Sequence, residues 1–441
     1  TNNTGIGSSA LKDNTTGNQN TAVGKDALRT ATEASENTAV GYQSLYSTTT
    51  GSSNTAVGHE CGTSNTTGQR NVAVGNTTLY SNTTGDDNTA VGRGALSQNT
   101  TASDNTAVGR NALYLNTTGT NNTAVGKGAL DANTTGERNT ALGVNALSTV
   151  TTGTNNVGIG VNALYANTSS SNTGVGDAAL YTNTSGSNNT AMGRNALFLN
   201  TTGYENVAIG NYALDANTTS HENTAVGYES LSSCTTGAHN TGIGHDALES
   251  VTTGSYNVAL GRDAGRGIVG GSNNVSIGSN ANDATNVTGN TAVGNFALSA
   301  NTSNYNVAVG YDAALNNTSG TAVTAIGAYC LDANTSGASN TGVGYSTLGA
   351  CTTGSSNTAI GSYALDANTT ASNNTAVGTS ALGACTSGNQ NTGVGKNALT
   401  TNTTGANNAA VGDRALESNT TGAKNTALGG VALYANTTAD N

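Results

Sequence analysis

One short pattern of apolar and polar residues recurs along the whole chain. An aliphatic residue followed by glycine returns 26 times, 17 residues apart except for three steps of 16, and the idealised unit reads N-T-A-V-G-x-x-A-L-x-x-N-T-T-G-x-x. This period is too short for paired helices or a propeller blade, and it suits one turn of a parallel β-coil with two short strands. The repeat therefore predicts an all-β parallel β-solenoid of about 26 coils, one continuous array over residues 1–441.

The alternation inside each unit predicts which side chains face the interior. In the run Asn20-Thr21-Ala22-Val23-Gly24 we expect Val23 to point inward and Ala22 outward, because successive strand residues point to opposite faces. The second apolar segment supplies an inward leucine. The predicted core residues are Val23, Leu28, Val40, Leu45, Val108 and Leu113.

The position before the aliphatic residue is almost always Ala, Gly or Ser, as at Ala22, Gly158 and Ser276. If this position faces outward, the backbone of a neighbouring copy can approach it closely, which favours a homo-oligomer. The alternative is that small residues avoid crowding on a narrow coil. Burial of the two large apolar side chains of one coil contributes roughly 2 kcal/mol each. This does not offset the conformational entropy lost when the coil becomes ordered, which costs about 1.5 kcal/mol per residue. Backbone ladders and lateral packing must therefore contribute.

The Asn-Thr-Thr-Gly segment has the chemistry of a tight turn, since Asn bonds its own backbone and Gly accepts positive φ. The same segment creates N-x-T sequons, which would be glycan sites in a eukaryotic secreted chain and simple turn residues elsewhere. They include Asn14, Asn82, Asn116, Asn133 and Asn200.

The repeat is irregular in a few places. The leucine column fails at Gly62, Gly265 and Asn282, and it slips by one position to Leu315. Two of these failures fall within residues 261–294, which we expect to hold a kink, a seam or an inserted loop. Neutral drift in one coil of many is the alternative.

Composition and charge exclude several functional classes. The chain has 14 Lys and Arg against a net charge of −11, whereas a nucleic-acid-binding surface needs clustered basic residues. No apolar run approaches the roughly 20 residues that cross a bilayer, so we expect no membrane insertion within this segment. We expect the five cysteines to be buried thiols that fill space, because their spacing does not favour intrachain disulfides.

Repetition also argues against an active site, because catalysis needs different groups that converge on one pocket. His59 with Glu60 and His245 with Asp246 share a repeat position, but they lie 11 coils apart and we expect no metal cluster from them. We predict no catalytic, cofactor-binding or metal-binding residues, and no enzyme activity.

Two surface columns carry aromatic and charged residues. The position after the repeat Gly holds half of the basic residues together with several tyrosines, and the position after the Leu holds several aromatic residues together with several Asp residues. Exposed tyrosines can stack on sugars or grip a protein, whereas the simpler interpretation is that they cover strand edges. The candidate surface-binding column is Tyr46, Tyr80, Tyr114, Tyr165 and Tyr181.

The unit resembles the head repeats of trimeric autotransporter adhesins, and similar arrays occur in tail-fibre-like phage proteins. The nearest local matches are residues 274–278 with Ala281 and residues 206–210 with Ala213. The resemblance implies a left-handed β-roll, a homotrimer, and a location that is extracellular, on the cell surface or on a virion. The unit here is longer by its N-T-T-G turn.

Together these features predict a non-catalytic structural or adhesive fibre segment, the head or shaft of a trimeric adhesin or tail-fibre-like protein. Its expected partners are copies of itself and a host-surface glycan or protein ligand. The main alternative is a subunit of a self-assembling extracellular filament or sheath. An ice-binding solenoid is a third, less favoured interpretation, because adjacent Thr residues in a turn point in different directions.

Overall fold

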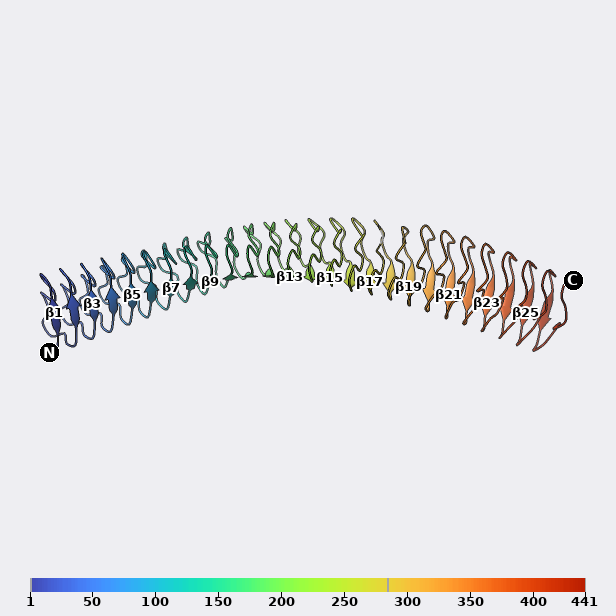
Figure 1. Cartoon of the computed structure of the whole chain (residues 1–441), viewed down its shortest axis with the longest axis horizontal. Helices are drawn as coiled ribbons and strands as arrows, with labels where there is room; N and C mark the ends of the chain where they lie inside the picture. The colour runs from blue at the N-terminus through green and yellow to red at the C-terminus, as the bar shows by residue number, and fades with distance from the viewer. Residues whose placement is uncertain (1, 284, 441) are drawn as a thin grey trace. The chain divides into compact units, whose positions relative to one another are not determined.

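The structure, a computed structural model, describes residues 2–283 and 285–440. Those residues contain 26 β-strands of three residues each and no helix, so the predicted all-β parallel β-solenoid is confirmed. The chain divides into two compact units, Thr1–Glu222 and Asn223–Asn441, and both units have this same architecture (Figure 1).

The first unit holds thirteen strands: β1 (Thr4–Ile6), β2 (Thr21–Val23), β3 (Thr38–Val40), β4 (Thr55–Val57), β5 (Val72–Val74), β6 (Thr89–Val91), β7 (Thr106–Val108), β8 (Thr123–Val125), β9 (Thr140–Leu142), β10 (Val157–Ile159), β11 (Thr173–Val175), β12 (Thr190–Met192) and β13 (Val207–Ile209). The second holds β14 (Thr224–Val226), β15 (Thr241–Ile243), β16 (Val258–Leu260), β17 (Val275–Ile277), β18 (Thr291–Val293), β19 (Val307–Val309), β20 (Thr324–Ile326), β21 (Thr341–Val343), β22 (Thr358–Ile360), β23 (Thr375–Val377), β24 (Thr392–Val394), β25 (Ala409–Val411) and β26 (Thr426–Leu428).

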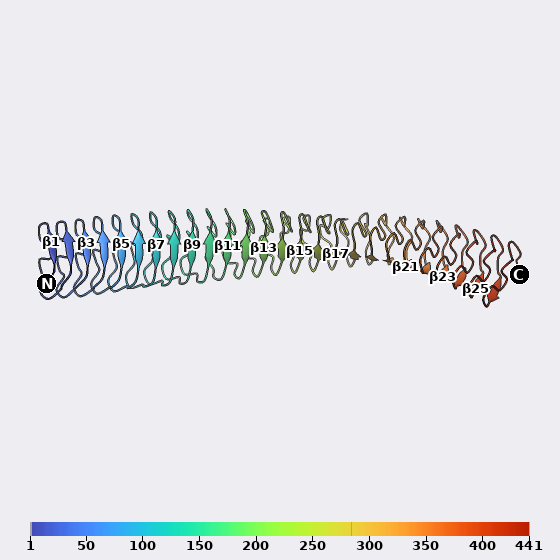
Figure 2. The ribbon, with the colours of Figure 1, turned by 60° about the horizontal axis from the view of Figure 1, so that its bottom comes forward.

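Within each unit every strand pairs in parallel with the strand of the next turn, as Figure 2 shows for the first unit. The register follows the repeat, so that Ala107 of β7 lies between Ala90 and Ala124. Backbone bonds run alternately to the following and the preceding turn: Thr106 N–H donates to the following turn and Gly109 N–H to the preceding one. Equivalent positions therefore form columns along the solenoid.

Each turn has one strand, where the sequence predicted two. The second apolar segment is a tight turn in which alternate residues have positive φ, as at Asn111 (φ 56) and Leu113 (φ 53). Its amides still bond between turns, since Leu113 N–H donates to Ala129 O at 2.9 Å. The left-handed residues bend the chain too sharply for a strand, and this unfavourable conformation for Leu is offset by its burial and by the bond.

The prediction that the aliphatic residue of each strand points inward is wrong. Ala22, Ala39 and Ala107 have no exposed surface, whereas Val23, Val40 and Val108 are only half-buried on the outer face. The predicted inward leucines, Leu28, Leu45 and Leu113, are confirmed as buried.

The physical reason is the narrow interior. The leucine of one turn packs directly beneath the small residue of the next strand, so there is room only for a small side chain. At Gly158, an added Cβ would already lie 3.0 Å from Cγ of Leu147 and 3.3 Å from Ala163 O. The column of small residues is therefore part of the core, and it cannot be the outer surface on which another copy packs.

Two columns of buried asparagines stabilise the turns, and we name them the strand Asn ladder and the turn Asn ladder. In the strand Asn ladder, Oδ1 of Asn88 accepts the backbone N–H of Asn105 at 3.1 Å and its Nδ2 group at 3.3 Å. In the turn Asn ladder, Nδ2 of Asn116 donates to Oδ1 of Asn99 and to Gly119 O, both at 2.9 Å. Asn105 also donates to Gly119 O, so both ladders close on the same carbonyl.

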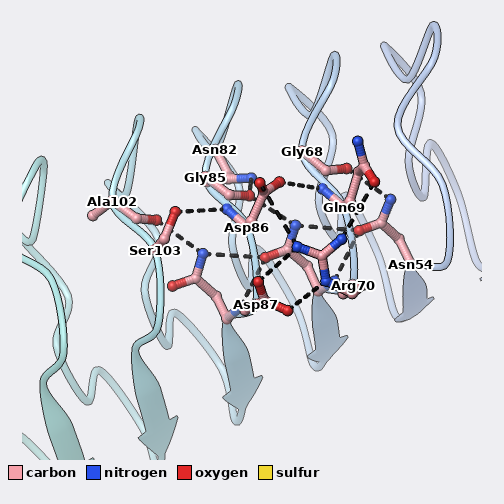
Figure 3. Close-up of polar contacts among 12 residues, drawn as sticks. Asn54, Gly68, Gln69, Arg70, Asn82, Gly85, Asp86, Asp87, Ala102 and Ser103 are labelled. Atoms are coloured by element: carbon pink, nitrogen blue, oxygen red, sulfur yellow. Dashed lines mark hydrogen bonds and ion pairs between the residues drawn. The ribbon is translucent and has the colours of Figure 1, made fainter.

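Figure 3 shows Asn54 of the strand Asn ladder and Asn82 of the turn Asn ladder, beside exposed polar contacts in the first unit. There the guanidinium of Arg70 binds the carboxylate of Asp87 on the next turn through two contacts of 2.7 and 2.8 Å. This pairing lowers the pKa of Asp87, chiefly through the hydrogen bond from Arg70. Ladder contacts, buried and exposed, thus connect each turn to the next.

The irregular stretch 261–294 keeps the solenoid register, because β16, β17 and β18 pair residue for residue. Where Gly265 replaces the leucine, Ile268 of the same turn is buried, and its Cδ1 lies 3.2 Å from where a Cβ on Gly265 would be. Asn282 is also fully buried in the leucine column. In this stretch, other buried side chains thus take the leucine position on the described turns, and the prediction of a kink, a seam or an inserted loop remains a prediction.

Candidate functional site

The predicted tyrosine column divides into stacked and separate rings. Tyr165 and Tyr181 stack at 5.1 Å between ring centroids with an interplanar angle of 8°, and Phe198 extends the stack at 5.3 Å. Tyr80 and Tyr114 lie on turns whose neighbours in this column are polar. The structure therefore brings together Tyr165 and Tyr181 of the predicted column, and leaves its other members apart from one another.

Tyr46, the remaining member, shows a second arrangement, in which a basic side chain of the chain itself covers the ring. The Arg29 guanidinium lies 5.6 Å from the ring centroid of Tyr46 and donates to its hydroxyl at 3.1 Å. Lys25 lies over Tyr42 at 5.8 Å in the same way. These are cation–π contacts, in which the negative face of the ring attracts the cation.

The second unit contains a longer aromatic series that the sequence analysis did not assemble. Tyr311, Tyr329, Tyr345 and Tyr363 lie on four consecutive turns, with centroids 5.5, 5.9 and 5.5 Å apart in edge-to-face geometry. The rings alternate between two neighbouring columns, and for this reason a search along single columns finds only every second one. We call these four residues the Tyr zigzag.

A surface groove of about 490 Å³ lies beside the Tyr zigzag. Two tyrosines form one side and two carboxylates from the column after the leucine form the other. Its lining residues are Tyr329, Asp332, Tyr345, Ser346, Gly349, Ala350, Asp366 and Ala367.

One of the residues that line the groove, Gly349, lies in sequence between the two aspartates of this column. It occupies the column after the leucine on the turn between Asp332 and Asp366, where most turns carry a side chain and Gly383 is a second exception. A Cβ at Gly349 would lie 3.0 Å from Oδ1 of Asp366, 3.5 Å from the backbone carbonyl of Ser346 and 3.6 Å from Oδ1 of Asp332. A side chain at this position would therefore make a close contact with the Asp366 carboxylate, which glycine avoids.

The groove is acidic, and the chain supplies no cation to balance it. Residues 267–395 contain no Lys, Arg or His, but they include Asp312, Asp332 and Asp366. Burial raises the pKa of each of these carboxyls, and the neighbouring charges of Asp312 and Asp366 raise the pKa of Asp332 further. Partial desolvation and neighbouring like charges thus both disfavour the charged form of Asp332.

A second polar cluster lies at His245. Its Nδ1 is 3.1 Å from Oδ2 of Asp246, and Asp263 of the next turn joins them, with their potential ligand atoms within 4.8 Å of one another. The sequence analysis overlooked this grouping because Asp263 stands 17 residues after Asp246. However, Asp263 is paired with Arg262 at 3.2 Å and Arg266 at 3.7 Å. These arginines engage the oxygens that a metal ion would need, so the cluster is best described as a network of ion pairs.

All five cysteines are buried thiols, as predicted. Where Cys replaces the asparagine of the turn Asn ladder, it bonds the same turn carbonyl, as Cys385 Sγ does to Gly388 O at 3.3 Å. Burial raises the pKa of Cys61 and Cys330 to about 12 and that of Cys351 and Cys385 to about 11. These thiols are protonated and unreactive at neutral pH.

The turn segments have buried asparagines and Thr pairs in which one residue is hydrogen-bonded and the other exposed. Of the five sequon asparagines named above, Asn82, Asn116, Asn133 and Asn200 are fully buried in the turn Asn ladder, whereas Asn14 is half-buried. In the following Thr pair, the hydroxyl of Thr117 donates to a carbonyl of the next turn and only Thr118 is exposed. The segment therefore acts as a structural turn with one exposed threonine.

Comparisons with known proteins add no relative. No family model matches the chain, and no curated protein matches its sequence. Among the described residues, no helix has the length and apolar character to cross a membrane. The fold is thus shown by the structure, and the resemblance to adhesin head repeats depends on the repeat motif alone.

Proposed function

We propose that this chain is a non-catalytic, extracellular fibre segment whose copies pack side by side, in the manner of the head or shaft of a trimeric adhesin or tail-fibre-like protein. The β-solenoid is a structural repeat fold, and the repeat motif resembles those head segments. Location outside the cell, on a cell or virion surface, is part of the same proposal.

The observation that carries the proposal is the exposed aliphatic column on the outer face of the strands. The residue before each repeat Gly is a Val, Ile, Leu or Met that the single chain leaves half-exposed, including Leu142 (47%), Met192 (43%) and Ile209 (38%). Regularly spaced apolar side chains along a rigid scaffold favour burial against a second copy. This column takes over the packing role that the sequence analysis gave to the small residues.

Sedimentation velocity on the purified chain tests the packing. We expect an oligomer, and we expect Leu142→Glu with Met192→Glu to shift it towards the monomer. Val144→Glu with Val161→Glu is the matched control, because these side chains are equally exposed (41% and 47%) but lie in the column after the Gly. A wild-type monomer at micromolar concentration would refute side-by-side packing.

The filament or sheath alternative uses the same aliphatic column but with open rather than closed packing. Negative-stain electron microscopy separates the two, since a closed trimer gives discrete particles at every concentration and a filament grows with concentration. Labelling of intact source cells or virions with a membrane-impermeant reagent tests the location. Labelling only after lysis would contradict the extracellular part of the proposal.

A further inference from the structure

The interior of the solenoid departs from the repeat at one place in the second unit, and the departure is polar. Along the whole chain the column of small strand residues holds a serine once, at Ser276, and the leucine column holds an asparagine once, at Asn282. Both residues belong to the same turn, and the preceding turn has Gly265 in place of the leucine. Three exceptions to the apolar core thus meet on two consecutive turns.

The polar groups of this turn are buried and have no partner in the described part of the chain. Ser276 and Asn282 have no exposed surface. Among the described residues, none bonds to Oγ of Ser276 or to Oδ1 and Nδ2 of Asn282. Asn116 of the turn Asn ladder, by contrast, donates twice through its Nδ2 group. Burial without a hydrogen bond is unfavourable for a hydroxyl and for an amide, so both side chains require a partner.

The missing side chain at position 265 gives the serine hydroxyl its place. Oγ of Ser276 lies 3.3 Å from the position that a Cβ on Gly265 would take. On a regular turn a leucine closes this direction, as Cγ of Leu147 lies only 3.0 Å from the Cβ position of Gly158. The N–H of Gly265 also donates, at 2.9 Å, to the carbonyl of the residue before Asn282. The glycine therefore lies beside both polar residues.

The repeat geometry also places Asn282 against Ser276. The leucine and the small strand residue of one turn are in contact, since Cδ1 of Leu11 lies 3.7 Å from the Cβ position of Gly5. Asn282 and Ser276 hold these two positions on their own turn. Their polar groups thus lie close together in the core, and yet they do not bond to each other.

We propose that an ordered water molecule is buried between Asn282 and Ser276 and joins the two side chains by hydrogen bonds. Water donates and accepts, so one molecule can accept from Nδ2 of Asn282 and donate to Oγ of Ser276. Buried waters occur where two to four polar groups meet. Asparagine is smaller than the leucine it replaces, and Gly265 has no side chain, so these two turns together have room that a regular pair of leucines fills.

The chemistry of the site selects water over an ion. Neither Asn282 nor Ser276 carries a charge, so a buried ion would stay unbalanced there. Gly62 provides an internal comparison, because it stands in the same column with the same φ of 61° as Gly265. Its neighbours in the two columns on the next turn are the apolar Ala73 and Leu79. A glycine in the leucine column is thus not enough, and the added polar pair makes the site.

Magnetic relaxation dispersion of water oxygen counts the water molecules that stay inside a protein, and it tests the inference on the full chain. We expect Ser276→Ala with Asn282→Leu to lose at least one long-lived water per chain. Both substitutions restore the residues that most turns carry, and an unchanged circular dichroism spectrum checks the fold. Leu365→Met is the matched control, since it changes the buried leucine column on another turn of the second unit. An unchanged count in the double variant, or an equal loss in Leu365→Met, would overturn the inference.

A high-resolution crystal structure of the chain gives the position of the water. We expect its oxygen at about 2.7–3.2 Å from Nδ2 of Asn282 and at a similar distance from Oγ of Ser276. A direct bond between the two side chains, or an Asn282 side chain turned out to solvent, would refute the site. The inference stands apart from the fibre proposal, because the water lies inside a single chain and needs no assembly of copies.

Discussion

Ala107 and Val108 are neighbours in β7 that lie on opposite faces of the strand, and an aspartate at each position gives opposite expectations. Ala107 has no exposed surface and lies between Ala90 and Ala124 of the adjacent turns. A carboxylate there would be buried without a partner, in an interior that admits a methyl group. We expect Ala107→Asp to destabilise the surrounding turns by about 3–5 kcal/mol, the cost of leaving a buried charge unpaired.

Val108→Asp should be far milder, because Val108 is half-buried on the outer face. Full burial of a valine side chain contributes about 1.5–3 kcal/mol, so losing part of this burial costs about 1 kcal/mol, and the carboxylate stays in water. Limited proteolysis compares the two variants, since turns that open locally are cut while the others resist. We expect early cleavage near residue 107 only in Ala107→Asp.

The converse result would refute the inside-out assignment. If Val108→Asp were cut first, or if both variants resisted equally, the alanine column could not be the core. Arg110→Ala serves as the control for a nearby exposed site, and we expect it to change the free energy of unfolding by less than about 0.5 kcal/mol.

Three further predictions follow from the buried polar groups. Asn116→Ala removes an amide that bonds a turn carbonyl and the neighbouring ladder, so we expect urea unfolding to show a free energy of unfolding about 1–3 kcal/mol lower than that of the wild type. A decrease no larger than that of Thr118→Ala, at an exposed position, would contradict this. The thiol of Cys351, with its pKa raised to about 11, should resist Ellman's reagent until guanidinium unfolds the chain; rapid labelling of the native chain would refute its burial. Because burial raises the pKa of Asp131 and Asp332, the folded state holds protons more tightly than the unfolded state at these groups. Their contribution to stability is present at low pH and is lost as pH rises through the raised pKa, so the urea midpoint should be higher at pH 4 than at pH 7, and a lower midpoint at pH 4 would contradict it.

The period and the turn chemistry were enough to predict the fold class, but the alternation of Ala and Val could not decide the inner face. Both faces of a three-residue strand satisfy the pattern, and hydrophobicity alone favours the larger Val inside. The deciding quantity is the distance across the coil, set by Leu147 beneath Gly158, which no local sequence pattern records. The leucines were predicted correctly because either choice of strand face leaves them inside.

The groove could not be predicted from the sequence for a related reason. Its residues belong to four different columns, and columns meet in space only after the coil closes. Tyr329 and Tyr345 are 16 residues apart, one fewer than the usual step, so a strict period of 17 separates neighbours that are in contact. Asp332 and Asp366 were visible as members of a column, but nothing in the sequence marked the groove that they line together with Gly349.

This geometry explains how a repeat with near-identical turns can still hold an individual site. The two Asn ladders and the Leu core occupy the same positions on nearly every turn, so the backbone keeps its course when an outer residue changes. One glycine in place of a larger side chain then removes side-chain surface from one turn without changing the strand register. Two carboxylates on the flanking turns are held at fixed positions by the same backbone. In such a scaffold, specificity arises where an outer column departs from its own pattern, and Gly349 between Asp332 and Asp366 is a departure of this kind.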